Sequence, residues 1–275
     1  MIGTTATLQR QVSLLQQQVR EMRQAVDESR QPRKSAVAMA ADLGLILDDW
    51  QQRALATESR DILLLASRQA GKSTVAGVAA LHQSISAPNS LTLIVSPSER
   101  QSKRLLRTVR RLYAHVRTQA PPVVEGILSI ELRNGSEIHA LPGSESTIRG
   151  FSAVDLLILD EASRIEDPLY EAVRPMLAVS NGKLMALSTP FGRRGWFWEE
   201  WDHGEGWHRE KITAAQVRRI DPAWLERERN RIGDWLYDQE YGCIFKSDGD
   251  AFFNHDLLVA SLSDELEPIF GGIAA

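Results

Sequence analysis

Four short runs of apolar residues constrain the fold of this chain more than any other feature. The runs are DILLLA, LTLIVS, VDLLILD and KLMALS, at residues 61–66, 91–96, 154–160 and 183–188. Runs of strand length without polar alternation are typical of strands buried on both faces. Helical patterns accompany them at about residues 72–83, 98–117 and 168–178. The sequence therefore predicts an α/β fold with a mostly parallel central sheet flanked by helices.

A β-hairpin is predicted beside this sheet. Asn134 and Gly135 favour a tight two-residue turn, and short apolar segments flank them at residues 130–132 and 137–140. We therefore expect an antiparallel edge there.

The composition excludes several classes of protein. Of 275 residues, 25% are charged and 43% are hydrophobic, as in ordinary globular proteins, so global disorder is excluded. The single Cys243 excludes a disulfide framework and a cysteine-built zinc site. The longest apolar runs fall far short of the roughly 18 residues that cross a bilayer, so no membrane partner is expected. A formal net charge of −4 says little against a nucleic-acid partner, because it averages a basic segment at 98–117 and an acidic segment at 155–171.

Three parts are expected along the chain: a helix and linker at 1–35, an α/β core at 36–212, and a polar helical segment at 213–275. In the first part, apolar residues recur at spacings of four and three, which is the a/d pattern of a coiled coil. They are Leu8, Val12, Leu15, Val19, Met22 and Val26. This stripe can pack against its own domain or mediate self-association, and the pattern does not distinguish the two.

A phosphate-binding loop is predicted at residues 66–73, ASRQAGKS, which follow one apolar run and precede a helix. The segment ends as a Walker A motif does, although Ala66 stands where the first glycine is usual. Backbone N–H groups of such a loop and the helix N-terminus bind phosphates. Lys72 is expected to reach the β- and γ-phosphates, and the Ser73 hydroxyl to coordinate Mg²⁺. The other expected nucleotide-binding residues are Arg68, Gln69, Ala70, Gly71 and Thr74.

Two adjacent carboxylates end the third apolar run. We expect Asp160 to bind Mg²⁺ and Glu161 to orient and deprotonate an attacking water. In this arrangement Asp160 corresponds to the aspartate of a Walker B motif. A glutamate directly after that aspartate is typical of the additional-strand, catalytic-glutamate class of P-loop NTPases, which includes RecA-like motors and helicases. The fold expected is therefore of this class.

Taken in order, five motifs resemble the ATPase domain of the large terminase subunit, the motor that packages DNA in tailed phages. The resemblance covers about residues 40–255. The motifs are DWQQ at 49–52, the Arg-containing loop at 67–73, IRG at 148–150, DEAS at 160–163 and STP at 188–190 with glycines and aromatic residues after it.

The resemblance implies ATP and Mg²⁺ as ligands and a role for individual residues. Gln51 would bind adenine, with Gln52 as a rival one position away. Arg68 would contact the γ-phosphate within the same subunit, and Arg149 would be donated to the neighbouring subunit. Ser188 and Thr189 would couple hydrolysis to DNA movement.

The resemblance also implies partners and a place of action. These are double-stranded DNA, further copies of the chain in a ring (a pentamer in the family), the portal and the small terminase subunit, in the cytoplasm of a bacterial host. Large terminases carry a nuclease domain as well. The residues after 250 show no strand-borne cluster of acids, so we expect the motor part without nuclease activity, with 213–275 as a lid and linker.

A basic helix follows the second apolar run. Seven basic residues face a single acidic one, Glu99, between 98 and 118. We expect Arg100, Arg104 and Arg107 to contact DNA phosphates, although a solvated helix face or a neighbouring subunit explains the pattern as well.

Two other interpretations stay open at this point. One is a helicase-like or transposition-associated DNA-dependent ATPase of the same architecture. The other is a non-catalytic assembly module whose shape is tuned by nucleotide.

Overall fold

The computed structural model describes residues 34–247, except 119, 145–147 and 149. Contacts divide the chain into two compact units, Met1–Lys34 and Ser35–Ala275, and all described residues except Lys34 belong to the second unit. The predicted coiled-coil helix, Arg149 and the segment after 247 lie outside the described residues.

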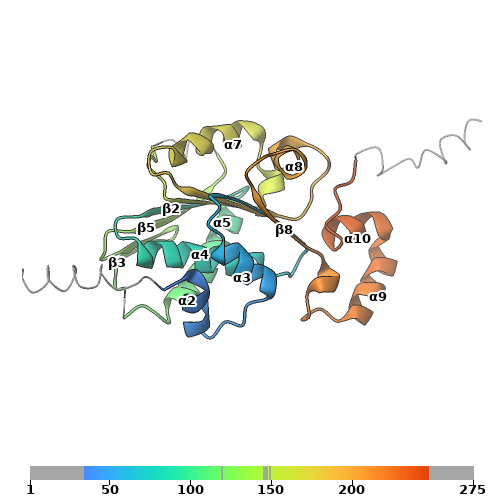
Figure 1. Cartoon of the computed structure of the whole chain (residues 1–275), viewed down its shortest axis with the longest axis horizontal. Coiled ribbons are helices and arrows are strands. Elements are labelled where there is room, and N and C mark those ends of the chain that lie inside the picture. The colour runs from blue at the N-terminus through green and yellow to red at the C-terminus, as the bar shows by residue number, and fades with distance from the viewer. Residues whose placement is uncertain (1–33, 119, 145–147, 149, 248–275) are drawn as a thin grey trace, which may run out of the picture. The chain divides into compact units, whose positions relative to one another are not determined.

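An eight-stranded sheet forms the centre of the fold (Figure 1), in the order β3-β4-β5-β2-β6-β7-β1-β8. The strands are β1 (Asp61–Ala66), β2 (Leu91–Ser96), β3 (Pro122–Glu125), β4 (Ser129–Leu132), β5 (Glu137–Pro142), β6 (Leu156–Asp160), β7 (Lys183–Ser188) and β8 (His208–Ile212). All neighbouring pairs from β5 to β8 across the sheet are parallel, whereas the pairs β3–β4 and β4–β5 are antiparallel. The predicted α/β fold with a mostly parallel sheet is confirmed.

The four apolar runs are all strands, and the predicted turn at Asn134 and Gly135 joins β4 to β5. Two edge strands, β3 and β8, were not predicted. The sequence of β8, HREKI, lacks the apolar pattern of a buried strand. Its buried Glu210 is paired with Arg53 from a helix, with Nη2 and Oε2 2.7 Å apart. A buried charge is tolerated when it is paired in this way.

Strand β7 lies between β1 and β6 and is parallel to both. The phosphate-binding loop follows β1 and the carboxylates end β6. The sheet therefore has the extra strand between these two that defines the additional-strand class of P-loop NTPases, as the sequence predicts.

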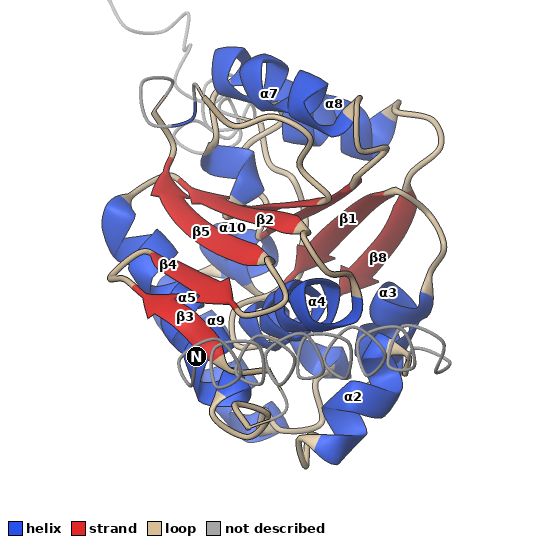
Figure 2. Ribbon diagram, turned by 90° about the vertical axis from the view of Figure 1, so that its left-hand side faces the viewer, coloured by secondary structure: helices blue, strands red, loops and turns tan. Residues whose placement is uncertain are grey.

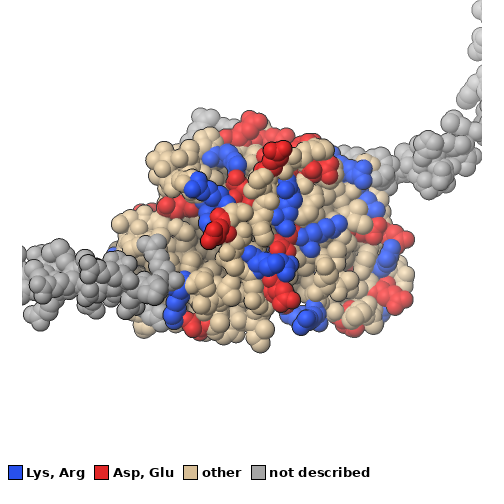
Figure 3. Space-filling view, in the orientation of Figure 1, with Lys and Arg blue, Asp and Glu red and all other residues tan. Residues whose placement is uncertain are grey.

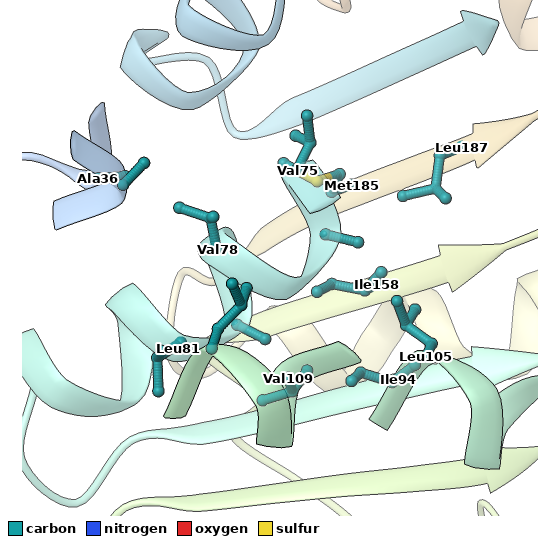
Figure 4. Packing of buried hydrophobic residues seen from close by; sticks show 14 of the residues in the cluster. Ala36, Val75, Val78, Leu81, Ile94, Leu105, Val109, Ile158, Met185 and Leu187 are labelled. Carbon is teal, nitrogen blue, oxygen red and sulfur yellow. The ribbon is translucent and has the colours of Figure 1, made fainter. Parts of the chain in front are cut away.

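Alternate residues of the central strands enter two separate cores, since successive side chains of a strand point to opposite faces. In β1, Ile62 and Leu64 belong to one core, and Leu63 and Leu65 to the other. Figure 4 shows part of the first core, where side chains of helices pack together with side chains of the sheet. The labelled residues of that core include Val75, Val78, Leu81, Leu105, Val109, Ile94, Ile158, Met185 and Leu187.

Helices cover both faces of the sheet (Figures 1 and 2). On one face lie α2 (Ala36–Asp42), α3 (Asp49–Ala56), α4 (Lys72–Ser86) and α5 (Glu99–Tyr113). On the other lie α7 (Asp167–Val173) and α8 (Gly195–Asp202), with the 3₁₀ turns η1 (Ala162–Arg164) and η2 (Arg174–Leu177). After β8, η3 (Ala214–Gln216) leads to α9 (Pro222–Ile232) and α10 (Asp234–Glu240), which lie beyond the β8 edge in Figure 1.

The aromatic residues near 196–207 pack against the sheet rather than beneath the last helices. Trp196, Phe197 and Trp207 belong to the core between the sheet and α7–α8. Trp196 stacks on Tyr170 with ring centroids 3.9 Å apart. The reason is that α8 returns to the sheet face, so its aromatic side is covered by α7 rather than by α9 and α10.

Acidic and basic side chains are interspersed on the face shown in Figure 3. Within the described part of the chain, no helix is long and apolar enough to cross a membrane.

Candidate nucleotide-binding site

The loop between β1 and α4 has the backbone of a phosphate-binding loop. Gln69 has a φ of 61° and Gly71 a φ of 103°, both left-handed, and α4 begins directly at Lys72. A Cβ on Gly71 would lie 2.6 Å from Gln51 Nε2, so only glycine fits there without displacing that amide. The loop thus presents its backbone at the N-terminus of a 15-residue helix.

Lys72 is buried at the centre of this loop. Its Nζ donates to the carbonyl oxygens of Ala66 at 2.6 Å and Ser67 at 3.0 Å. Burial lowers the pKa of Lys72, while the negative charges of Glu161 and Asp160 act in the opposite direction. The lysine therefore lies within the electrostatic range of both predicted carboxylates.

Arg68, in the same loop, is paired with a residue that sequence reasoning missed. Its Nε donates to the Glu240 carboxylate at the end of α10, and its backbone N–H donates to the Glu240 carbonyl at 3.2 Å. The hydrogen bond to Glu240 raises the pKa of Arg68, and the charges of Glu240 and Glu161 add to it. Glu240 has no sequence signal, since it belongs to no motif and lies 172 residues from Arg68.

Gln51 lies against the loop from α3. Its Oε1 accepts from the backbone N–H of Asp48 at 2.9 Å, and its Nε2 donates to the carbonyl of Gly71 at 3.3 Å. Gln52, its rival in the sequence, is exposed and donates to the carbonyl of Leu47. The structure therefore brings Gln51 to the phosphate loop and leaves Gln52 outside it.

A second missed residue, Arg219, joins the same region. Its Nη1 contacts both carboxylate oxygens of Asp48, at 3.0 and 2.9 Å, and its Nη2 donates to the carbonyl of Ala70 at 3.0 Å. Arg219 thereby ties the segment before α9 to α3 and to the phosphate loop.

Asp160 and Glu161 stand at the C-terminal end of β6. The phosphate loop begins at the same end of the parallel strands, after β1. Burial raises the pKa of Asp160 to about 7, with Glu161 adding to the rise and Lys72 opposing it. Glu161 has a left-handed backbone, with a φ of 52° and a ψ of 45°. Since a non-glycine residue adopts this conformation only when its surroundings impose it, the turn after β6 is tightly determined.

The donor set suits Mg²⁺. A serine hydroxyl and an aspartate carboxylate are hard oxygen donors, of the kind that Mg²⁺ prefers. Burial raises the pKa of Asp160 because it disfavours the charged carboxylate, and a divalent cation beside Asp160 would compensate that charge. No group of three or more His, Cys, Asp or Glu side chains that could hold a metal occurs among the described residues.

Ser163, in η1, connects the β6 edge to the end of β7. Its hydroxyl lies 2.7 Å from that of Ser188 and donates to the carbonyl of Thr189 at 2.8 Å, and its backbone N–H donates to Ser188 Oγ at 3.2 Å. Ser188 and Thr189 are both buried. The two residues predicted to couple hydrolysis are thus bonded directly to the turn that follows the carboxylates.

The basic side chains of α5 serve different purposes. Arg100, Arg104 and Arg107 are exposed, and the charge of Arg104 lowers the pKa of Asp160, although it is the weakest of the causes. Arg110 instead donates to the carbonyls of Gly126 and Ser129, so it holds the β3–β4 hairpin.

The mostly parallel sheet contains the extra strand β7. The loop after β1 turns at a glycine and buries a lysine, and a carboxylate pair stands at the end of β6. Together these features define a P-loop NTPase of the additional-strand class. Residues 63–260 match the family described as "Terminase large subunit, T4likevirus-type, N-terminal". The chain belongs to this family.

Two curated large terminase subunits, from Thermus phage G20c and Thermus virus P23-45, are each 29% identical to the chain over 230 residues. The match covers 70% of this chain and 47% of each relative. The chain therefore spans about half the length of the curated relatives it matches.

Solved structures share the fold. The ATPase domain of the large terminase from Thermus phage P74-26 superposes with a TM-score of 0.66 at 24% identity, covering 75% of this chain and 97% of that one. The large terminase of a thermophilic bacteriophage, solved in complex with ADP, has a TM-score of 0.59 at 13% identity, with 72% and 54% covered.

Proposed function

We propose that this chain hydrolyses ATP and that the work drives double-stranded DNA into a viral procapsid. The observation that carries the proposal is the parallel arrangement of β1, β7 and β6. Because these strands run in the same direction, Lys72, after β1, and the pair Asp160–Glu161, at the end of β6, lie at the same end of the sheet. The family of the chain supports nucleotide as the ligand, as do the ADP and ATP-γ-S complexes of the thermophilic bacteriophage terminase.

Each residue at this edge has a proposed role. Lys72 leaves the carbonyls of Ala66 and Ser67 to bind the β- and γ-phosphates, and the backbone N–H groups of residues 69–74 bind the remaining phosphate oxygens. Ser73 and Asp160 hold Mg²⁺, which when bound neutralises charge on the phosphates. Glu161 orients a water molecule for in-line attack and accepts its proton.

Two arginines and a glutamine complete the proposed site. Arg68 contacts the γ-phosphate of its own subunit, and Arg149 stabilises transition-state charge in the neighbouring subunit of a ring, a pentamer in the family. Gln51 recognises adenine, which is supported by its place at Gly71.

The partners are proposed from the family. They are double-stranded DNA, contacted by Arg100, Arg104 and Arg107, together with the portal and the small terminase subunit, in the cytoplasm of a bacterial host. Residues 213–275 serve as a lid and linker, and we expect no nuclease activity from this chain.

A pair of variants tests hydrolysis. Glu161→Gln should bind ATP with an affinity within about threefold of the unmodified chain and lose more than roughly 99% of its turnover, as expected when a catalytic base is removed. Lys72→Ala should lose nucleotide binding itself. If the unmodified chain binds ATP but releases no phosphate in the presence of Mg²⁺ and DNA, it is an assembly module tuned by nucleotide, and the motor proposal is wrong.

A further inference from the structure

We propose that Ser96, at the end of β2, is a further positioning residue of the nucleotide site. Its hydroxyl donates a hydrogen bond to the Asp160 carboxylate when nucleotide and Mg²⁺ are bound, and this bond keeps Asp160 in the orientation that binds the metal. The inference rests on the proposed function, because it requires that Mg²⁺ bind at Asp160.

The pairing of β2 with β6 places Ser96 beside Asp160. The two strands are parallel, and their register aligns Val95 with Leu159. One further step along both strands aligns Ser96, the last residue of β2, with Asp160, the last residue of β6. Since neighbouring strands lie about 4.8 Å apart, a hydroxyl and a carboxylate at aligned positions can reach each other when both side chains point to one face of the sheet.

Both side chains do point to the same face. Successive side chains of a strand alternate between the two faces, so residues two positions apart share one. Ile94, two residues before Ser96, and Ile158, two residues before Asp160, both belong to the core that α4 and α5 cover. Ser96 and Asp160 therefore face the side of the sheet on which α4 begins at the phosphate loop.

The Ser96 hydroxyl is buried without a partner. Ser96 is 0% exposed, and its Oγ has no hydrogen bond within the part of the chain that the structure describes. The backbone of the residue is held in place, because its carbonyl accepts from the backbone N–H of Gly143 at 2.7 Å. Buried hydroxyl groups are nearly always hydrogen-bonded, so one that is not indicates a bond that forms in another state of the site.

The Asp160 carboxylate can accept this bond. The hydrogen bond that acts on it comes from the backbone of Glu161, and no described side chain donates to it. A carboxylate has about four lone-pair positions, so one oxygen can bind a metal while the other accepts from a serine. A hydrogen bond to a charged carboxylate is about twice as strong as one between neutral groups. Because a divalent cation keeps Asp160 charged, the bond is favoured in the loaded site.

A matched control lies on the same strand. Thr92 is also 0% exposed, and its Oγ1 also has no partner among the described residues. Thr92 shares the face of Ser96, since an even number of positions separates them. It aligns with Leu156, at the opposite end of β6 from Asp160. Thr92→Val therefore removes a comparable hydroxyl, with almost no change in volume, away from the site.

The first experiment measures the affinity of the non-hydrolysable analogue AMP-PNP by titration calorimetry, once with Mg²⁺ and once in EDTA. Ser96→Ala should weaken binding with Mg²⁺ about tenfold, as is usual when the partner of a metal ligand is removed, and should change binding in EDTA by less than about twofold. Ser96→Cys, which nearly keeps the volume but is a weak donor, should behave in the same way. Thr92→Val should change neither affinity.

A double variant tests whether Ser96 acts through Asp160. Asp160→Asn should itself lose most of the gain in affinity that Mg²⁺ gives. In this background, Ser96→Ala should lower the affinity with Mg²⁺ by less than about twofold, because the carboxylate that the hydroxyl would position is absent.

Melting temperatures without nucleotide and metal separate positioning from stability. Since the fold makes no hydrogen bond to this hydroxyl, Ser96→Ala should melt no more than about 2 °C below the unmodified chain. A purely structural role predicts a lower melting temperature and an equal loss of the two affinities, which would overturn the inference.

The outcomes distinguish this inference from the proposed function. If the unmodified chain binds no nucleotide, or if Asp160→Asn keeps the full effect of Mg²⁺, the proposed site itself is wrong. The inference alone is overturned if Asp160→Asn loses the effect of Mg²⁺ while Ser96→Ala and Ser96→Cys keep it. It is also overturned if the loss in Ser96→Ala persists in the Asp160→Asn background, or if Thr92→Val shows the same loss.

Discussion

The hydroxyl groups of Ser163 and Ser188 lie 2.7 Å apart, which joins the turn after the predicted carboxylate pair to the end of the neighbouring strand. The carbonyl of Thr189 accepts from the same Ser163 hydroxyl. Since Ser163 lies two residues after Glu161, its side chain connects the turn that contains Glu161 to the end of β7.

Ser188→Ala tests this connection. We expect turnover to fall about tenfold and ATP affinity to stay within about twofold, because the lost hydrogen bond orients the turn without touching nucleotide. Steady-state ATPase assays and calorimetry measure the two. Ser84→Ala removes another buried hydroxyl, bonded to the Ala80 carbonyl in α4, and should leave turnover unchanged. Equal losses in both variants would show that the Ser188 effect is one of stability only.

Asp160 should make stability depend on pH. Its pKa is about 7 in the folded chain, raised first by burial and then by Glu161. An unfolded chain releases this proton near pH 4, so the folded chain binds more protons between about pH 4 and 7, and this group lowers stability as the pH rises through that range.

Asp160→Asn removes this dependence. In EDTA we expect its melting temperature to exceed that of the unmodified chain by roughly 3–8 °C at pH 8, with the difference vanishing near pH 4. Differential scanning calorimetry across this range is the measurement. A difference of constant size at every pH would contradict the raised pKa.

Gln51 should contribute both to stability and to the recognition of adenine, whereas its neighbour Gln52 should contribute to neither. Since both ends of its amide are bonded, Gln51→Ala should lower the free energy of unfolding by about 1–3 kcal/mol without nucleotide. It should also lose the preference for ATP over GTP. Gln52→Ala, at an exposed position, should change neither quantity, as judged by urea unfolding and competition binding. A loss of ATP preference in Gln52→Ala alone would move adenine recognition to that residue.

Arg100 and Arg107 should contact DNA without supporting the fold. Replacing both with Ala should reduce the slope of log affinity against log salt by about 2, near 0.9 for each phosphate that is no longer neutralised, at an unchanged melting temperature. Fluorescence anisotropy between about 50 and 200 mM salt would show this. Arg110→Ala is the control: it loses its bonds to Gly126 and Ser129, so it should lower the melting temperature and keep the salt slope. An unchanged slope in the double variant would place DNA on another surface.

The sequence by itself determined the central strands β1, β2, β6 and β7, the phosphate loop and the carboxylate pair. Each depends on residues adjacent in the chain: an unbroken apolar run is stable as a strand only when buried on both faces, and Gly71-Lys72-Ser73 forms its loop through local backbone geometry. Asp160 and Glu161 could be found for the same reason, since they directly end such a run.

The tertiary structure alone decided which distant side chains meet these motifs. Glu240 reaches Arg68, and Arg219 reaches Ala70, because α9, α10 and the segment before them fold back beside β8. Strand β8 itself was hidden, since the pairing of Glu210 with Arg53 lets a charged residue lie in a buried strand. An ion pair depends on the distance between two groups in space. No periodicity of polar residues along the sequence indicates which distant residue will be the partner.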